Sequence, residues 1–592
     1  MTATVRYTLR PIRPEAHLFE ATLTVDAPDK AGQRVTLPAW IPGSYMIRDF
    51  ARQIVSIRAE SAGKRLALTQ LDKHSWLAEP TKKALTVTVE VYAYDLSVRG
   101  AYLDITRGFF NGTSVFLRPE GLAEQPCTLD ILPPEGKAFD GWTVATSLAP
   151  LDVNKKTGFG RYGAAAYDEL IDHPFELGDF ERVTFKACGV PHEIVVSGRH
   201  RGDLKRLARD AKKICEYQIR LFGEPAPFER YVFLLYAGGD IYGGLEHRAS
   251  TALVANRDDL PLKGDKALSD GYLQLLGLIS HEYFHSWNVK RIKPAAFTPY
   301  ELSTENYTRL LWAFEGVTSY YDDLTLVRAG LIDRERYLQL LAKTITAVER
   351  GAGRRKQTLE ESSFTAWNKY YRQDENSPNA IVSYYAKGAL AALALDLFIR
   401  EKSGGVKSLD DVMRALWSKW LADGQGLAEH EWEAIAEAVT GLDLADFFAS
   451  ALRATEELPL ARLLATQGVT LTFDAAASAS DRGGLADSAN VKERAVLGAK
   501  TAADPLGVKL TQVFDGGAAQ AAGLSGGDVL VAIDHLKASD VDKQLARYAR
   551  GDRITVHYFR RDELASATLE LAAAPTDTAR LALAGDAAWL HR

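Results

Sequence analysis

The sequence predicts a multidomain α+β protein, with β-structure at both ends and a mostly helical middle. The length of 592 residues corresponds to roughly three to five domains of ordinary size. The first ~185 and the last ~100 residues alternate apolar and polar positions as strands do, whereas residues from about 265 to 455 repeat at the helical period. A content of 46% hydrophobic and 25% charged residues is typical of a globular protein and excludes a low-complexity chain.

Charge and hydropathy exclude further classes of protein. Lys and Arg number 71 against 77 Asp and Glu, a net charge of −6, which argues against a nucleic-acid binder that works mainly by electrostatics. No apolar run is long enough for a membrane-spanning helix, so we expect none. The first residues lack the apolar core of a signal peptide. We therefore expect the cytoplasm for the chain as written, with a processed periplasmic or secreted form as the alternative.

The chain has only three cysteines, Cys127, Cys188 and Cys215, and none of them forms a Cys-x-x-Cys pair. We expect buried free thiols, because such spacing is typical neither of a disulfide framework nor of a thiolate zinc site.

Two local patterns define elements in the first part. Residues Leu85–Val91 alternate apolar and polar side chains, which predicts a strand. The dipeptide Asn111-Gly112 lies between two short apolar runs and is typical of a tight turn, so we expect a β-hairpin there.

The middle of the chain opens with a helix and a buried strand. Apolar residues from Leu204 to Ile219 share one helical face, and Gly223 ends the run. The apolar run Tyr231–Tyr236 predicts a strand buried on both faces. Residues 460–485 are rich in small and polar residues and predict a linker or a weakly structured entry to the last part. Beyond it, Asp528–Ile533 and Arg553–Tyr558 predict strands, and a small-residue segment before Asp528 predicts a helix.

The strongest chemical signal is the sequence HEYFH. Its histidines, His281 and His285, lie four residues apart, so their imidazoles share one helical face and converge on a point. Zinc accepts neutral imidazole nitrogen, and the intervening Glu282 can act on water at the metal as a general base. The apolar residues before the motif predict a buried helix with Ser269 or Asp270 as its N-cap.

A catalytic zinc needs a third protein ligand and an open fourth position. Glu315 is the candidate, because the chain between His285 and Glu315 is long enough for a loop and a returning helix. A carboxylate in the aromatic segment 311–321 would be costly to bury without a partner. Glu301 and Glu305 in the connecting loop are the alternatives.

Two more segments fit a site that binds peptide. Gly243 and Gly244 precede Glu246, and a Gly-Gly pair lets a substrate backbone approach an edge strand closely. Glu246 could then bind a cationic group; the alternative is a solvated turn residue. The segment SYYAKG at 383–388 opens a helix, and a tyrosine hydroxyl there could donate to an oxyanion. Core packing is the alternative role of those tyrosines.

Together these motifs resemble the glycyl aminopeptidase family of zinc metallopeptidases. The resemblance extends over essentially the whole chain and rests on HEYFHSWN with the following KRIKP, on residues 312–321 around Glu315, and on LPAWIPGSY at 37–45. It implies a β-sandwich-like N-terminal domain at 1–187 and a mostly helical, thermolysin-like catalytic domain at 188–460. A linker and a PDZ domain are implied at 461–592.

The resemblance also implies a metal site and a reaction. One zinc ion per chain would be held by His281, His285 and Glu315, with Glu282 as the base. The implied substrates are peptides with a free N-terminus, from which small first residues, Gly or Ala, are removed.

Two substrate-binding roles follow from wider relatives, the gluzincin aminopeptidases. These carry a glycine-containing motif that ends in a glutamate binding the substrate's α-amine. Gly243-Gly244-Leu245-Glu246 matches it, and His247 follows the glutamate. Their oxyanion donor is the tyrosine of a Tyr-x-Lys-Gly sequence, which implies Tyr385 and not Tyr384.

The last part resembles a PDZ domain through Pro505–Val508, Ala518–Leu524 and Gly527–Leu530, which are similar to its carboxylate-binding loop, helix and following strand. A PDZ groove binds a peptide by strand addition and captures its terminal carboxylate. The implied partner is a peptide C-terminus, and a purely architectural domain is the alternative.

Two other functions stay open on the sequence alone. A zinc endopeptidase would use the same HEYFH motif, and a PDZ-bearing peptide-binding protein could carry an inert protease domain. Because every proposed catalytic residue lies between 243 and 388, we also expect a chain ending near residue 460 to keep the zinc site.

Overall fold

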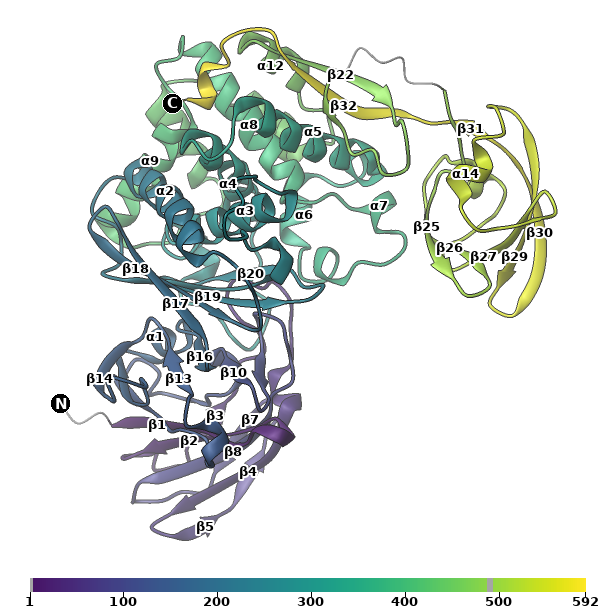
Figure 1. Cartoon of the computed structure of the whole chain (residues 1–592). Coiled ribbons are helices and arrows are strands. Elements are labelled where there is room, and N and C mark those ends of the chain that lie inside the picture. Colours follow the sequence, from purple (N-terminus) through teal and green to yellow (C-terminus); the bar gives the residue numbers. More distant parts are fainter. Residues whose placement is uncertain (1–3, 487–492, 592) are drawn as a thin grey trace. The chain divides into compact units, whose positions relative to one another are not determined.

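The structure is a computed structural model that describes residues 4–486 and 493–591 (Figure 1). The chain forms two compact units. The first consists of Met1–Asn306 with Trp420–Gly426, and the second of Tyr307–Lys419 with Leu427–Arg592. The domain boundaries expected near 187 and 460 stay predictions.

The first unit opens with an eight-stranded sheet. In β1 (Val5–Arg13) buried and partly exposed side chains alternate, because successive side chains point to opposite faces and one face packs on the core. The strand predicted at 85–91 is confirmed as β8 (Leu85–Tyr92). Across the sheet the other strands are β14 (Ala149–Val153), β15 (Gly160–Ala164), β12 (Cys127–Ile131), β2 (Leu18–Val25), β4 (Ile54–Ser61) and β5 (Lys64–Leu66).

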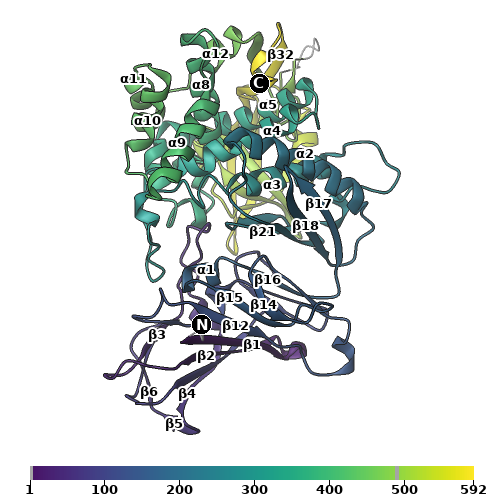
Figure 2. The same ribbon diagram turned by 90° about the vertical axis from the view of Figure 1, so that its left-hand side faces the viewer.

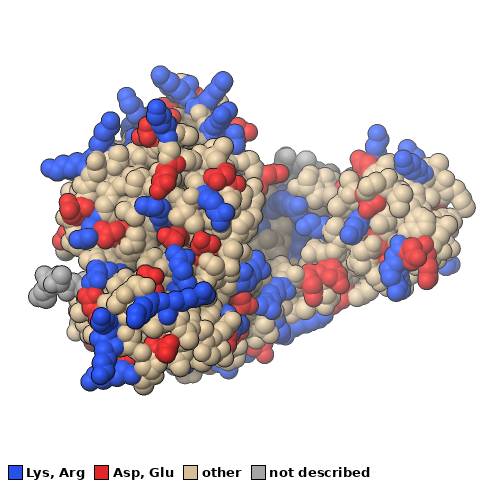
Figure 3. All heavy atoms as spheres, turned by 90° about the horizontal axis from the view of Figure 1, so that it is seen from below, with Lys and Arg blue, Asp and Glu red and all other residues tan. Residues whose placement is uncertain are grey.

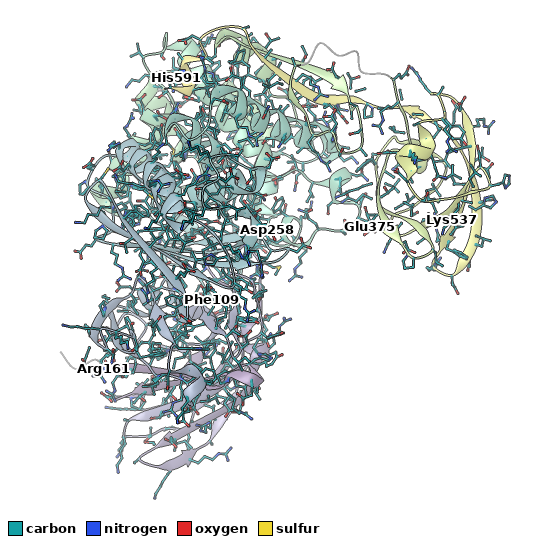
Figure 4. All side chains as sticks on the ribbon, in the orientation of Figure 1. Phe109, Arg161, Asp258, Glu375, Lys537 and His591 are labelled. Atoms are coloured by element: carbon teal, nitrogen blue, oxygen red, sulfur yellow. The ribbon has the colours of Figure 1, made fainter. Side chains whose placement is uncertain are left out.

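Two four-stranded sheets complete the β-rich part of this unit. Phe109 of β10 (Arg107–Phe110), labelled in Figure 4, is buried like the whole of that strand. The first sheet has the order β13 (Thr143–Ala145), β16 (Phe175–Gly178), β10 and β9 (Ala101–Leu103), with α1 (Tyr167–Ile171) before β16. The second has the order β11 (Arg118–Pro119), β3 (Arg34–Thr36), β7 (Ser75–Ala78) and β6 (Leu68–Gln70).

The hairpin expected at Asn111-Gly112 is wrong. β10 pairs with β9 and β16 instead, and a short 3-10 helix follows Asn111. A two-residue hairpin of this type needs positive φ at both central residues, whereas Asn111 has an extended backbone and Gly112 has no positive φ. The Asn111 side chain donates hydrogen bonds to the carbonyl oxygens of Val98 and Gly100, so contacts remote from the dipeptide decide its conformation.

A five-stranded sheet forms the rest of the first unit. Its order is β17 (Glu181–Ala187), β18 (Val190–Ser197), β19 (Tyr231–Gly238), β21 (Ser250–Asn256) and β20 (Gly243–Glu246). β19 contains the predicted buried strand. β20 is the last strand of the sheet, pairs antiparallel with β21, and is therefore an edge strand.

Helices α2 (Leu204–Phe222) and α3 (Asp270–Phe284) pack against each other and against this sheet (Figures 1 and 2). Both expected helices are confirmed, each with the one end that the sequence indicates. Gly223 follows α2 at its C-cap, and the Ser269 side chain caps α3 by accepting the backbone N–H of Tyr272 at 3.1 Å. The HEYFH motif thus occupies the last turn of a capped, buried helix.

The second unit is mostly helical up to residue 466, as the periodicity predicts. The helix α8 (Ala386–Lys402) is buried over most of its length, which makes it the centre of the unit's core. The other helices are α4 (Val317–Arg328), α5 (Arg334–Arg350), α6 (Leu359–Phe364), α7 (Ser377–Ala380), α9 (Leu409–Asp423), α10 (Glu431–Thr440), α11 (Ala445–Phe448) and α12 (Leu460–Thr466).

Residues 460–485 are better ordered than their composition predicts. They contain α12 and β22 (Val469–Ala475), and β22 pairs antiparallel with β32 (Thr576–Leu583). Small, polar residues favour a linker only in isolation, and the partner strand lies too far along the chain for a local pattern to reveal it. Past β32, Trp589 is fully buried and its ring packs against Tyr337 of α5, with 5.5 Å between centroids.

A chain ending near residue 460 would therefore lose a strand and a buried tryptophan of the helical unit. Beyond the β22–β32 pairing, the Thr346 hydroxyl on α5 accepts the backbone N–H of Ala579 at 2.9 Å. That a chain ending near residue 460 keeps the zinc site stays a prediction; such a chain would leave α5 without these contacts.

Between β22 and β32 the chain forms a six-stranded sheet with an apolar core of its own. The predicted strands are confirmed as β27 (Val529–Ile533) and β29 (Arg553–Arg560), and the small-residue helix as α13 (Ala518–Ala521). The remaining elements are β25 (Ala499–Asp504), β26 (Gly507–Val513), β28 (Leu536–Lys537), β30 (Glu563–Glu570) and α14 (Val541–Leu545), with β23 (Gly484–Leu485), β24 (Ala495–Val496) and β31 (Ala572–Ala573) at the connections.

The surface fits the balanced composition. On the face shown in Figure 3, basic and acidic side chains are interspersed. Among the helices of the described residues, none combines the length and the apolarity that crossing a bilayer requires. The three cysteines are free thiols, and burial raises the pKa of Cys215 well above its ordinary value.

Candidate metal centre and substrate site

The two motif histidines lie at the end of α3, one helical turn apart. Their ring centroids are 4.7 Å apart and the rings are nearly perpendicular, at 85°. Nδ1 of His285 lies 2.7 Å from the carbonyl oxygen of Asn288. A carbonyl only accepts, so Nδ1 carries the proton and Nε2 is the nitrogen with a lone pair for a metal. The chain thereby fixes the tautomer that a metal-binding histidine needs.

Polar side chains beneath α3 fix its position. The Gln218 amide on α2 donates to the carbonyl oxygen and the hydroxyl of Ser280, at 2.9 and 3.0 Å. Nε2 of His192, on β18, lies 2.8 Å from the hydroxyl of Tyr283. Burial lowers the pKa of His192 to about 4, so this histidine is neutral at physiological pH.

The expected base, Glu282, meets the edge strand β20. It is 5% exposed, and a Cβ placed on Gly244 would come within 2.1 Å of its Oε1. Any other residue at 244 would displace the Glu282 carboxylate. Glycine at position 244 therefore makes room for the Glu282 carboxylate, in addition to any role in the approach of a substrate. Ligand atoms of Glu246, Glu282 and His285 lie within 4.8 Å of one another, which gathers two carboxylates and an imidazole at one point.

Glu246, at the end of β20, is a buried carboxylate with unused hydrogen-bonding capacity. Its exposure is 3%, and within the described residues its Oε1 has no hydrogen-bond partner. A buried carboxylate oxygen without a donor is costly, so such a site favours a cationic ligand.

A tight turn from the β-rich part covers the same carboxylate. The backbone N–H of Ser44 donates to the carbonyl oxygen of Ile41 at 3.0 Å, with Pro42 and Gly43 between them and Gly43 at φ +97°. Pro followed by a residue of positive φ is typical of a type II turn. A Cβ on Gly43 would lie 2.5 Å from Oε1 of Glu246, so only glycine allows this approach.

His247 belongs to a buried ionic cluster rather than to the open side of the site. Its Nδ1 lies 3.6 Å from Oδ1 of Asp172, and the Lys290 ammonium lies 2.6 Å from the same oxygen. Burial lowers the pKa of His247. Burial opposes ionisation of Asp172, but Lys290, Arg248 and His247 together outweigh it and hold the pKa of that carboxyl well below its usual range. The cluster anchors the chain just beyond Glu246.

In the second unit, Glu315 lies on an unusual helical turn. Trp312–Gly316 forms a single π-helical turn, η7, that leads into α4, and Glu315 is 2% exposed there. π-helical turns within α-helices are frequent at functional sites. A Cβ on Gly316 would lie 2.6 Å from Cα of Gly388, so η7 and α8 pack backbone against backbone. The expected alternative Glu301 is exposed and accepts the backbone N–H of Ser303.

Tyr385 and Tyr384 have different surroundings. Tyr384 is fully buried, whereas Tyr385 is half-buried and its hydroxyl lies 3.0 Å from that of Tyr371. Tyr370 links this group to Glu315: burial and then the Glu315 charge raise the pKa of Tyr370, and its ring lies 5.6 Å from that of Tyr385. The close packing of Gly388 on η7 thus brings the start of α8 near Glu315.

The structure gathers the expected residues into two groups. In the first unit, His281, His285, Glu282, Gly243, Gly244 and Glu246 lie on the adjoining elements α3 and β20. In the second, Glu315 lies on η7 and Tyr385 is the N-cap residue of the adjoining α8. Sequence reasoning missed Gly43, Asn288 and Tyr371. The Pro42-Gly43 dipeptide was the available signal for Gly43. The backbone carbonyl contact of Asn288 and the pairing of Tyr371 with Tyr385 leave no recognisable pattern in the sequence.

Comparisons with known proteins match two parts of the chain to one peptidase family. A family model for the peptidase M61 N-terminal domain matches residues 6–179, and one for M61 glycyl aminopeptidase matches residues 274–391. The chain is 42% identical to an aminopeptidase N family protein from Idiomarina loihiensis of solved structure, over 99% of this chain and 100% of that one, with a TM-score of 0.95. No curated protein sequence matches the chain significantly.

More distant solved structures include an M1 zinc metallopeptidase from Deinococcus radiodurans, 15% identical over 78% of this chain and 96% of that one. Another is Legionella pneumophila aminopeptidase A in complex with aspartic acid, 15% identical over 76% of this chain and 49% of that one. Both have a TM-score of 0.48, too low to bear on function.

Proposed function

The chain belongs to the M61 family and is a metallo-aminopeptidase, and we propose that it uses zinc to remove small N-terminal residues, Gly and Ala, from peptides. The observation that carries this proposal is the buried carboxylate of Glu246, whose Oε1 has no partner within the described residues and which lies beside Glu282 and His285. A peptide's ammonium group is the cation that would satisfy it.

The proposed zinc ligands are His281, His285 and Glu315, with one ion per chain. Imidazole nitrogen and carboxylate oxygen are ordinary zinc donors, and the Asn288 carbonyl fixes the tautomer that leaves Nε2 of His285 for the metal. Bound zinc supplies Lewis acidity, which makes water nucleophilic at neutral pH and polarises a carbonyl group. Glu315 is proposed on the sequence pattern and on its burial in a π-helical turn.

Two residues handle protons and developing charge in the proposed mechanism. Glu282 takes the proton of the attacking water and passes it to the leaving amine. Tyr385 donates its hydroxyl hydrogen to the carbonyl oxygen as negative charge grows on it. The half-buried position of Tyr385 supports this role over Tyr384, which lies in the core.

The preference for small first residues is proposed from the turn over Glu246. The ammonium bound by Glu246 sits on the first residue's Cα, so that residue's side chain must fit beside the Pro42–Gly43 turn. Because Gly43 is already in contact distance of the carboxylate, little room is left on that side. Gly and Ala need the least.

For the last part, we keep the PDZ domain as a proposal. A six-stranded sheet with two short helices and its own core supports it. A peptide C-terminus is the proposed ligand, with a purely architectural role as the alternative.

The experiment that tests the proposed function compares p-nitroanilides of Gly, Ala and Leu with N-acetyl-Ala p-nitroanilide, with and without a chelator. We expect chelation to abolish activity and zinc to restore it. Free Gly and Ala substrates should be cleaved and the acetylated one should not. Equal cleavage of acetylated and free Ala substrates would instead establish the endopeptidase alternative.

Glu246→Gln makes this test specific. The variant removes one charge from a charge-assisted pair, so kcat/KM should fall by about ten- to a hundredfold. The matched control is Glu301→Gln, which removes an exposed carboxylate in the same unit and should leave kcat/KM near wild type. Normal activity of Glu246→Gln would remove the proposed amine site.

A further inference from the structure

The outer edge of β20 presents backbone groups to a ligand. The backbone N–H of His247 donates to the carbonyl oxygen of Ser250 at 3.0 Å, which closes the β20–β21 hairpin. Antiparallel partners alternate between hydrogen-bonded and non-hydrogen-bonded pairs. Counting back from this pair, Leu245 and Gly243 bond to β21, whereas the N–H and C=O of Gly244 point away from it. No further strand of the sheet covers that edge.

A cation from the β-rich part lies at this edge. Arg99, in the loop between β8 and β9, places Nη2 3.4 Å from the carbonyl oxygen of Gly244. Its Nη1 lies 3.7 Å from where a Cβ of Gly243 would be. Nε of Arg99 is buried without a hydrogen-bond partner, and Arg99 forms no ion pair with any residue that the structure describes. A guanidinium with five donors therefore keeps most of them available for a ligand.

The charges along β20 are complementary to the charged ends of a short peptide. Glu246 is the anion at one end, and the Arg99 cation lies at Gly244, two residues away, which is about 7 Å along a strand. An extended dipeptide spans about the same distance between its ammonium and its carboxylate. A substrate that runs antiparallel to β20, with its amine at Glu246, brings the residue after the scissile bond to Gly244.

We propose that Arg99 binds a carboxylate carried by the residue that follows the scissile bond, so that the enzyme selects dipeptides. The inference rests on the proposed function, because it takes the amine position from Glu246. The terminal carboxylate of a dipeptide and an acidic side chain share this chemistry. Arg99 pairs bidentately with either, as guanidinium groups commonly do with carboxylates.

The test measures kcat/KM for Ala-Ala, Ala-Ala amide, Ala-Asp amide and Ala-Asn amide. We expect the wild type to favour Ala-Ala over its amide by roughly ten- to a hundredfold, the usual effect of one charge-assisted pair. Preference for Ala-Asp amide over Ala-Asn amide would identify an acidic side chain as a second source of the carboxylate. Added salt should reduce the preference, because Arg99 is only partly buried.

Three variants sharpen the result. Arg99→Gln should bring the Ala-Ala preference close to one, and Arg99→Lys should retain part of it, because lysine keeps the charge but not the paired donors. Arg65→Gln, which removes an exposed arginine of the edge strand β5, should keep the wild-type ratio.

An unchanged ratio in Arg99→Gln would overturn the proposal. So would a wild type that hydrolyses Ala-Ala and Ala-Ala amide equally well, a result that stands even if the variant fails to fold. Loss of the preference alone leaves the aminopeptidase function intact, whereas no hydrolysis of any free Ala substrate counts against the proposed function instead.

Discussion

The α3–β20 region of the first unit and the η7–α8 region of the second position their chemical groups by different means. In the first, hydrogen bonds from buried polar side chains fix the helix: Gln218 to Ser280, His192 to Tyr283, and His285 to the Asn288 carbonyl. In the second, two glycines let backbones touch, and Glu315 and Tyr385 follow from that packing. Polar contacts hold the helix of the first region, whereas backbone contact between two glycines holds the second region together, so the two should respond differently to mutation and pH.

The largest effect is expected at the chemical core of the first region. Glu282→Gln keeps the size of the side chain but removes the base, so kcat should fall by about 10²–10⁴-fold. Zinc content, measured by metal analysis of the pure protein, should stay near wild type, because Glu282 is not a proposed ligand. Retained turnover in zinc-loaded Glu282→Gln protein would exclude Glu282 as the base.

In the second region, Tyr385→Phe should lower kcat and kcat/KM together by about 10²–10³-fold, because the hydroxyl acts mainly in the transition state. KM and zinc content should change little. Tyr384→Phe is the matched control and should be mild in its effect on turnover. If Tyr384→Phe is the inactive variant and Tyr385→Phe is nearly normal, the oxyanion donor is misassigned by one residue.

Gly388→Ala tests the packing on which the second region depends. The new Cβ would lie 2.9 Å from Cα of Gly316, and inserting a methyl group into a close-packed contact typically costs about 1–3 kcal/mol. The melting temperature should fall, and activity should fall with it as η7 and α8 separate. Gly484→Ala, where a Cβ meets nothing within 4 Å, should melt like the wild type. Equal melting temperatures of Gly388→Ala and the wild type would show that the contact between Gly388 and Gly316 does not contribute to stability.

The smallest effect is a pH dependence confined to the first region. The pKa of His192 is about 4 when folded, below its ordinary value of 6.5, so the unfolded chain takes up the proton first as pH falls. Stability is therefore complete above pH 6.5 and is lost as pH falls toward 4, by about 1 kcal/mol between pH 6.5 and 5.5. His192→Gln should remove this part of the slope in denaturant titrations. An identical slope in wild type and variant would contradict the assignment.

The sequence predicted what is encoded by neighbours in the chain. Five consecutive residues define the motif on α3, and the periodicity around Leu204 and in Leu85–Val91 predicted the elements that form. The predictions failed where a segment distant in the sequence determines the local conformation. Asn111 donates to carbonyl oxygens outside its dipeptide. β22 pairs with a strand more than a hundred residues away. The contact of Gly43 with Glu246 is of the same kind, since neither residue's neighbours indicate the other.

The pairing of β22 with β32 has a consequence for how the protein is made. Arg350, at the end of α5, forms an ion pair with Asp577, and Trp589 packs on the same helix. Ribosomes add about 5–20 residues per second, so roughly ten to fifty seconds pass between the synthesis of α5 and that of β32. Throughout that interval a nascent chain holds α5 without its covering strand. The helical unit is therefore completed late in translation, only after β32 has been made.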